Sequence, residues 1–292
     1  MGLTKNMCEL ILSAKLKRHI NLDKLIMVGR QNLHLSPNHL AISLEKFGYS
    51  VDNVSKILTK DNTFADSFFK EIGGKEIHSI DASDYEDATI IHDLNEPLSN
   101  TYKNNYTLVL DSGTLEHVFN FAQAIKNCME LTQVGGHFMG IYPCNNFFGH
   151  GFYQFSSELF YRVFCKANGF EIIDVVLFVD DMETEFYNVP DTSETHQRIQ
   201  FINTKPVYIY VLAKRIELTN LFKNQPLQMD YAQIKWKGKR SNLKHLVKQK
   251  SLKQYIPQYF KNLLKALFNK ANKPDNIHFK KPYFSVYNLK SN

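Results

Sequence analysis

The residues that could carry chemistry stand where short apolar runs end. The runs at 25–28, 76–80, 89–92 and 106–111 are each followed by polar or small residues. In an open parallel sheet, ligands bind beyond the carboxyl ends of the strands, where the strand order switches. We therefore expect a ligand site at these ends, formed by Gly29, Arg30, Gln31, Asp81, Ala82, Asp93, Leu94, Asp111 and Ser112.

Asp81 favours one class of ligand. A carboxylate after the second strand can accept hydrogen bonds from both hydroxyls of a ribose, and neighbouring polar groups can contact an adenine edge. The pattern therefore suits a cofactor that contains adenosine. Two structural alternatives stay open, since Asp81 precedes the acidic residues at 84, 86 and 87 and could belong to a solvated turn, while Asp93 could cap a turn.

A second group of candidates follows two further strand ends. His117 stands just after the run at 106–111, and the segment NNFFGHGFYQFS at 145–156 carries His150 and Tyr153. Histidine has an unperturbed pKa suited to general-base catalysis, so these three are the candidate catalytic residues. Alternatively, Glu116 and His117 begin a helix, where an acid interacts favourably with the dipole. The spacing of acids, histidines and cysteines predicts no nucleophilic triad and no metal site.

The elements that position these residues follow from the alternation of apolar runs with helical patterns, which predicts an α/β fold with a mostly parallel sheet. Ser36 and Pro37 start one helix and Gly48 ends it, and we expect Gly135 and Gly136 to end another. The connection at 180–206 lacks a crossover helix, so the last two strands should form an antiparallel hairpin. The seven expected strands are 25–28, 76–80, 89–92, 106–111, 137–142, 170–179 and 207–214.

The run LVLDSGTLEHV, followed one helix later by VGGHFMGIYP, resembles the class I S-adenosylmethionine-dependent methyltransferases over roughly residues 22–216. The segments HSIDASDYEDATIIHDLNEPL and NNFFGHGFYQFSSELF further resemble a bacterial subgroup associated with glycan or small-molecule modification. The resemblance implies a Rossmann-like, seven-stranded sheet ending in an antiparallel hairpin. It also implies S-adenosyl-L-methionine as cofactor, and methyl transfer to an oxygen or nitrogen of a small molecule, sugar or lipid-linked glycan.

By this resemblance Gly29 lets the backbone approach the methionine part of the cofactor, and Asp81 binds the ribose. Asp93 and Leu94 flank the adenine, while Asp111 and Ser112 line the junction of cofactor and substrate. Two positions depart from the family pattern, because Met27 replaces an acidic residue and Gln31 replaces a second glycine. Arg30 is expected to pair with the cofactor carboxylate, or alternatively with an acid on a neighbouring loop.

We expect a methyltransferase-like domain at 1–216, with an amphipathic N-terminal helix at 1–21 and an inserted helical lid at about 49–72. A basic, partly helical extension follows at 217–292, and from residue 233 onward it has fifteen lysines or arginines and one acid. This extension has three interpretations: a solvated appendage, an anchor on an anionic membrane surface, or a nucleic-acid contact. Nucleic acid is the less favoured partner, since Arg240 is the one arginine there.

The cellular context follows from the cysteines and the N-terminus. Four widely spaced cysteines without a CxxC pair favour a reducing, cytoplasmic location, peripheral on the inner face of a membrane if the tail binds lipid. The N-terminal segment resembles neither a signal peptide nor a membrane span. The activity that the resemblance implies is that of a methyltransferase. The alternatives are a non-catalytic binding or scaffold protein with the same fold, and a nucleic-acid methyltransferase that uses the tail.

Overall fold

The computed structural model describes residues 2–59, 63–195, 199, 201–229, 231, 278–279 and 285–290. The predictions about the basic tail therefore fall largely outside the described residues.

All seven predicted strands form one sheet, in the order β5-β4-β2-β6-β7-β11-β8. The neighbours from β5 to β7 pair in parallel, whereas β11 lies antiparallel between β7 and β8. The predicted fold class is confirmed as an α/β fold whose mostly parallel sheet includes an antiparallel pair, β8 and β11. The strands are β2 (Lys24–Val28), β4 (Glu76–Asp81), β5 (Ile90–Ile91), β6 (Tyr106–Ser112), β7 (Thr132–Asn145), β8 (Phe170–Val179) and β11 (Val207–Arg215).

The sheet has nine strands rather than seven, because β9 (Tyr187–Asn188) and β13 (Ser285–Val286) extend it beyond β8. Two small sheets stand apart from it. In one, β1 (Gly2–Leu3) pairs in parallel with β3 (Asn32–Leu33), and in the other β10 (Phe201–Ile202) pairs antiparallel with β12 (His278–Phe279). The N-terminus therefore lies beside the loop that follows β2.

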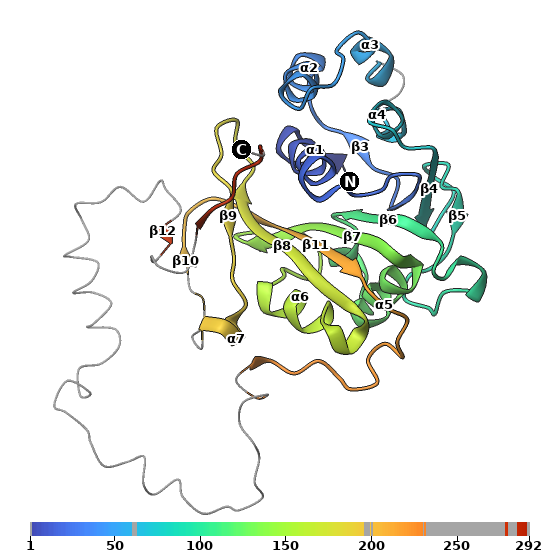
Figure 1. Ribbon diagram of the computed structural model, residues 1–292, viewed down its shortest axis with the longest axis vertical. Coiled ribbons are helices and arrows are strands. Elements are labelled where there is room, and N and C mark those ends of the chain that lie inside the picture. The colour runs from blue at the N-terminus through green and yellow to red at the C-terminus, as the bar shows by residue number, and fades with distance from the viewer. Residues whose placement is uncertain are drawn as a thin grey trace, which may run out of the picture.

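Helices cover both faces of the sheet, because successive side chains of each buried strand point to opposite faces. Met27 contributes to the core cluster under the N-terminal helices, and its neighbour Ile26 contributes to the cluster on the other face. Figure 1 shows α1 to α4 on one face and α5 and α6 on the other. The helices are α1 (Lys5–Arg18), α2 (Pro37–Lys46), α3 (Val54–Ile57), α4 (Asp66–Glu71), α5 (Phe121–Leu131), α6 (Ser157–Val163) and α7 (Thr192–Thr195).

Helix α1 is a core element, and its burial is not confined to the one face that the expected amphipathic helix would bury. Residues 6–14 are all buried, including the polar ones. Near its start, the side chains of Thr4 and Asn6 each donate a 2.9 Å hydrogen bond to Asp180, just beyond β8. At its end, Arg18 pairs with Asp174 of β8 at 2.7 Å. The helix therefore lies along the sheet, tied to β8 by polar contacts near both of its ends.

The helix boundaries were predicted with mixed success. Ser36 accepts a hydrogen bond from the His39 amide at 3.2 Å and Pro37 is the first helical residue of α2, as expected. By contrast, α5 ends at Leu131, and the expected helix end at Gly135 and Gly136 was wrong because both glycines lie inside β7. A Cβ on Gly136 would come within 2.8 Å of the Tyr106 carbonyl oxygen, so close backbone approach is the reason for that glycine.

The described end of the basic extension returns to the domain. Tyr287 and Leu289 are buried in the core cluster that contains α1, and Ser13 donates a 2.7 Å hydrogen bond to the Leu289 carbonyl. Figure 1 shows the C-terminus beside α1.

The interval predicted as a lid contains α3 and α4. Val54 and Ile57 of α3, together with Phe68 and Phe69 of α4, are buried in the cluster that α1 joins. Its movement as a lid stays a prediction. Among the helices of the described residues, none is long and apolar enough to cross a membrane.

Replacing Leu10 in α1 by alanine should lower the free energy of unfolding by about 3 kcal/mol, because the side chain is 1% exposed and its removal leaves a cavity. Leu16→Ala in the same helix is the control, since Leu16 is 44% exposed and its loss should cost less than about 1 kcal/mol. Urea unfolding of both variants measures the difference. Equal effects would show that α1 does not belong to the core.

Candidate functional site

The candidate site lies at the carboxyl edge of the parallel strands, where the strand order reverses at β2. This strand pairs with β4 on one side and β6 on the other, which makes its end the topological switch point. Gly29 directly follows β2 with a φ of 69°, and its amide donates a 2.8 Å hydrogen bond to the Ile80 carbonyl. The positive φ favours glycine, so this residue sets the turn toward β4.

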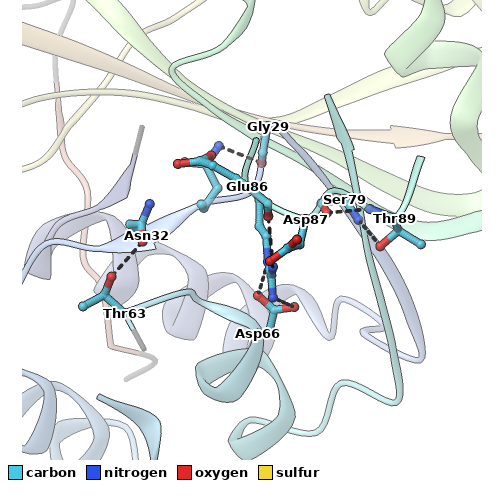
Figure 2. Close-up of polar contacts among 10 residues, drawn as sticks. Gly29, Asn32, Thr63, Asp66, Ser79, Glu86, Asp87 and Thr89 are labelled. Atoms are coloured by element: carbon cyan, nitrogen blue, oxygen red, sulfur yellow. Dashed lines mark hydrogen bonds and ion pairs between the residues drawn. The ribbon is translucent and has the colours of Figure 1, made fainter. Parts of the chain in front are cut away.

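Arg30 is held by groups of the protein. Its guanidinium lies 3.3 Å from the Asp66 carboxylate, donates to the Glu86 carbonyl at 3.0 Å and stacks over Phe64 at 4.0 Å. Figure 2 shows Asp66, Glu86 and Asp87 around the end of β2. The structure thus contains the alternative partner, an acid on a neighbouring segment. Arg30 joins the loop after β2, the start of α4 and the loop after β4.

Gln31 fills the place where the family pattern has a second glycine. Its side chain is fully buried, and its amide nitrogen donates to the carbonyls of Val28 at 3.0 Å and Gly29 at 3.3 Å. Its Oε1 is buried without a hydrogen-bond partner among the described residues. The Gln31 side chain therefore lies inside the loop after β2 and binds the backbone carbonyls of that loop. The other departure, Met27, is buried in the core beneath α1.

Asp81 presents a carboxylate at the end of β4. The side chain is partly exposed, and within the described part of the chain it makes no hydrogen bond or ion pair. Its carbonyl accepts a 2.8 Å hydrogen bond from the His92 amide, which keeps the segment after β5 beside it. Ala82, which follows, is exposed. The carboxylate is accessible, and its predicted role in binding a ribose stays a prediction.

Asp93 and Leu94 are placed differently from the expectation that both flank an adenine. Asp93 accepts hydrogen bonds from the amide and side chain of Asn95 at 2.9 and 2.8 Å, and these bonds lower the pKa of its carboxyl. It therefore caps a turn, the alternative that the sequence left open. Leu94 is buried in the core, so its side chain is not exposed to a ligand. A contact with adenine stays a prediction for the backbone here.

Asp111 and Ser112 are the last two residues of β6, and both are buried. The Asp111 carboxylate accepts hydrogen bonds from the amides of Thr114 at 2.9 Å and Leu115 at 3.2 Å, and burial nevertheless raises its pKa to about 6. Ser112 lies against Met7 of α1, with 3.6 Å between its hydroxyl oxygen and the methionine sulfur. Their predicted role beside the substrate remains untested, since both side chains are occupied by contacts within the protein.

Glu116 and His117 lie in a 3-10 turn (Leu115–His117), whereas α5 begins only at Phe121, so the expectation that they begin that helix was wrong. The Glu116 side chain is 1% exposed, and both its oxygens lack a hydrogen-bond partner among the described residues. Gly113 has a φ of 91°, and a Cβ there would lie 3.2 Å from Glu116 Oε1. Burial, with the Asp111 charge, raises the Glu116 pKa to about 8.

His150 reaches Glu116 from the loop after β7. Its Nε2 lies 3.5 Å from Glu116 Oε1, and its ring packs edge-on against that of His117 with 5.0 Å between centroids. Gly151, with a φ of 70°, allows this approach, because a Cβ there would lie 2.8 Å from the Glu116 carbonyl oxygen. Burial, then the neighbouring His150, lowers the His117 pKa. The two predicted catalytic histidines are thus brought together.

Tyr153, the third predicted catalytic residue, anchors this loop. Its hydroxyl donates a 2.6 Å hydrogen bond to the Phe119 carbonyl, and its ring stacks on Phe155 in the core. Catalysis by Tyr153 remains untested, and the contact that the structure shows is a structural one. Around the loop, Phe119, Phe148 and Phe152 are exposed by 73%, 100% and 65%, so an aromatic rim borders His150.

A cavity of about 470 Å³ opens beside the same loop. Its volume suits a small molecule, since ligand pockets commonly measure some hundreds of cubic ångströms. It is lined by Cys144, Asn145, Gln154, Phe155, Ser156, Ser157, Leu177, Val189, Ile199 and Ile202.

Comparison with known proteins finds similarity in structure alone, since no family model and no curated protein matches the sequence. TehB from Haemophilus influenzae is 12% identical, with a TM-score of 0.33; the match covers 71% of this chain and 61% of TehB. The 1,6-didemethyltoxoflavin-N1-methyltransferase of Burkholderia thailandensis, solved with S-adenosylhomocysteine, is 12% identical, covering 72% of this chain and 79% of that enzyme, with a TM-score of 0.36.

The branched-chain polyamine synthase of Thermus thermophilus, solved with 5'-methylthioadenosine, is also 12% identical; the match covers 78% of this chain and 62% of the synthase, with a TM-score of 0.37. At such values a similarity establishes neither reaction nor substrate. The functional case therefore depends on the strand order and on the residues at the sheet edge.

The buried Glu116 carboxyl should make stability depend on pH. Because its folded pKa of about 8 exceeds the ordinary value of 4.5, its stabilising effect is complete below pH 4.5 and is lost as pH rises through 8. The unfolding free energy of the wild type, relative to Glu116→Gln, should fall by about 1 kcal/mol per pH unit between pH 5 and 8. Urea titrations with a chelator present measure this, and exposed Glu96→Gln is the control. A constant difference would contradict the burial effect.

Proposed function

We propose that this chain binds S-adenosyl-L-methionine at the switch-point edge and transfers its methyl group to an oxygen or nitrogen of a small molecule, sugar or lipid-linked glycan. The observation that carries the proposal is the Asp81 carboxylate at the end of β4, beside the turn at Gly29, which has no hydrogen bond or ion pair within the described part of the chain. It lies in a sheet with the class I methyltransferase strand order. An adenosine ribose supplies the two hydroxyl donors that such a carboxylate accepts.

In this proposal, each residue at the switch-point edge of the sheet has its own role. Asp81 accepts hydrogen bonds from the ribose, and the turn at Gly29 leaves room for the cofactor backbone atoms. Arg30 holds the loop after β4 in place by its contacts with Asp66 and Glu86. The expected ion pair between Arg30 and the cofactor carboxylate is not needed, since a backbone amide can also bind a carboxylate.

Methyl transfer at this site is a direct displacement. A lone pair on the acceptor atom attacks the methyl carbon, the bond from carbon to sulfur breaks, and its electron pair stays on sulfur as the neutral thioether. The acceptor then loses a proton if it was an O–H or a protonated amine, and His150, half exposed and beside the two loops, is the candidate base. Alignment of the three atoms supplies much of the rate acceleration.

The acceptor is proposed to lie on the β7 side of the edge. The cavity lined by Asn145 and Gln154 and the exposed rim of Phe119, Phe148 and Phe152 together suit a compact molecule with an apolar or ring-shaped surface.

The alternative of a non-catalytic binding or scaffold protein is favoured by Gln31. Its amide already donates to the carbonyls of Val28 and Gly29, which are the groups available to the cofactor's amino group. Restoring the family pattern at Met27 would not test this alternative, because a glutamate there would be buried in the apolar core. Binding of the cofactor by the wild type decides between a methyltransferase and a non-catalytic protein.

A role of the basic tail in binding nucleic acid or membrane stays a prediction outside the described residues.

Asp81→Asn should weaken the binding of S-adenosylhomocysteine at least tenfold, because a charged acceptor of two hydrogen bonds is lost. Asp84→Asn is the matched control, since Asp84 lies on the exposed turn that follows and should change affinity less than twofold. Isothermal titration calorimetry measures both. If the wild type gives no heat and no thermal shift at millimolar ligand, the non-catalytic alternative is the correct one.

Arg30→Ala and Asp66→Ala should each weaken the binding of S-adenosylhomocysteine, by about tenfold and about threefold respectively, because both remove the ion pair and Arg30→Ala also removes the contacts with Glu86 and Phe64. The double variant should be little worse than Arg30→Ala alone. If instead Arg30 binds the cofactor carboxylate, Arg30→Ala will have a large effect and Asp66→Ala almost none. Titration calorimetry on the three variants separates these outcomes.

A further inference from the structure

Three side chains of the types that serve as metal ligands lie close together beside the proposed acceptor position. One ligand atom each from Glu116, His117 and His150 can be chosen so that all three lie within 4.8 Å of one another. The His150 Nε2 to Glu116 Oε1 distance of 3.5 Å already matches the separation of about 3.4 Å between two ligands of one tetrahedral ion. Both histidines are exposed, so their rings can turn by the small amount that full coordination needs.

The Glu116 carboxyl independently indicates a missing partner. It is 1% exposed, yet neither oxygen has a hydrogen-bond partner among the described residues. Buried polar groups are usually paired, since leaving one unpaired costs free energy. Two glycines with positive φ, Gly113 and Gly151, keep the backbone close around it, so the loops are shaped to hold this carboxyl beside His150.

We propose that Glu116, His117 and His150 bind one divalent transition metal ion of the manganese-to-zinc series. Two imidazoles and one carboxylate suit such ions, whereas Mg²⁺ and Ca²⁺ prefer oxygen ligands alone. Three protein ligands leave coordination positions open, which is typical of catalytic rather than structural metal sites. The sequence predicted no metal site because the ligands come from two loops that only the fold brings together.

At its open positions the ion would bind an oxygen of the acceptor, beside the loop that carries Phe148 and Phe152. This second part rests on the proposed function. A hydroxyl bound to the ion has a lower pKa and releases its proton to solvent, after which the oxygen attacks the methyl carbon. His150 is then a metal ligand and not the general base. The acceptor class becomes a hydroxyl compound.

The test uses the full chain, stripped with a chelator and titrated with Co²⁺, whose visible absorption reports coordination by imidazole. Saturable binding of one equivalent is expected, with competition by Zn²⁺ and none by millimolar Mg²⁺. Glu116→Gln and His150→Ala should each weaken Co²⁺ binding at least tenfold. His19→Asn replaces an exposed histidine at the end of α1 and should leave it unchanged. Circular dichroism and urea unfolding confirm that each variant is folded.

The same preparations are titrated with S-adenosylhomocysteine, which keeps the two proposals distinguishable. Cofactor binding without saturable Co²⁺ binding, or Co²⁺ binding unchanged in both site variants, would overturn the metal site and leave the methyltransferase proposal intact. Co²⁺ binding without cofactor binding would support the metal site and remove its role in methyl transfer.

Discussion

Strand β2 hydrogen-bonds to β4 on one side and to β6 on the other, and residues 25–28 are fully buried. Every feature of the candidate site depends on this pairing, because it brings three loops from distant parts of the chain to one edge. Helix α1 covers one face of the strand, and the chain end at Tyr287 and Leu289 packs beside α1. The N-terminus and the C-terminal residues therefore stabilise the same strand whose end forms the proposed cofactor site.

The two sides of this sheet edge differ in the residues that order their loops. On the β4 side, the side chains of Arg30 and Gln31 order the loop after β2, and Asp81 has no polar partner among the residues that the structure describes. On the β7 side, glycines bring two loops together around the buried carboxyl of Glu116 and its neighbour His150. In the proposed function, the adenosine of the cofactor lies on the β4 side and the acceptor lies on the β7 side.

The sheet could be predicted from the sequence because its central strands are continuous apolar runs, whose burial does not depend on a particular partner. For the candidate site, the sequence indicated which residues follow the strand ends but not what their side chains contact. The partner of Arg30 is Asp66 on another helix, and the inward fold of Gln31 has no local signal. The full burial of residues 6–14 was not predicted, because the polar residues among them pair with groups that are distant in the sequence.

Hydrogen–deuterium exchange with S-adenosylhomocysteine tests the central claim most directly, since it locates the ligand along the chain without any substitution. The account predicts slower amide exchange in the loops after β2, β4 and β6, at residues 29–36, 82–95 and 113–118, with little change in α6. Absence of protection at saturating ligand, or protection confined to segments away from this edge, would contradict a cofactor site at the strand-order switch.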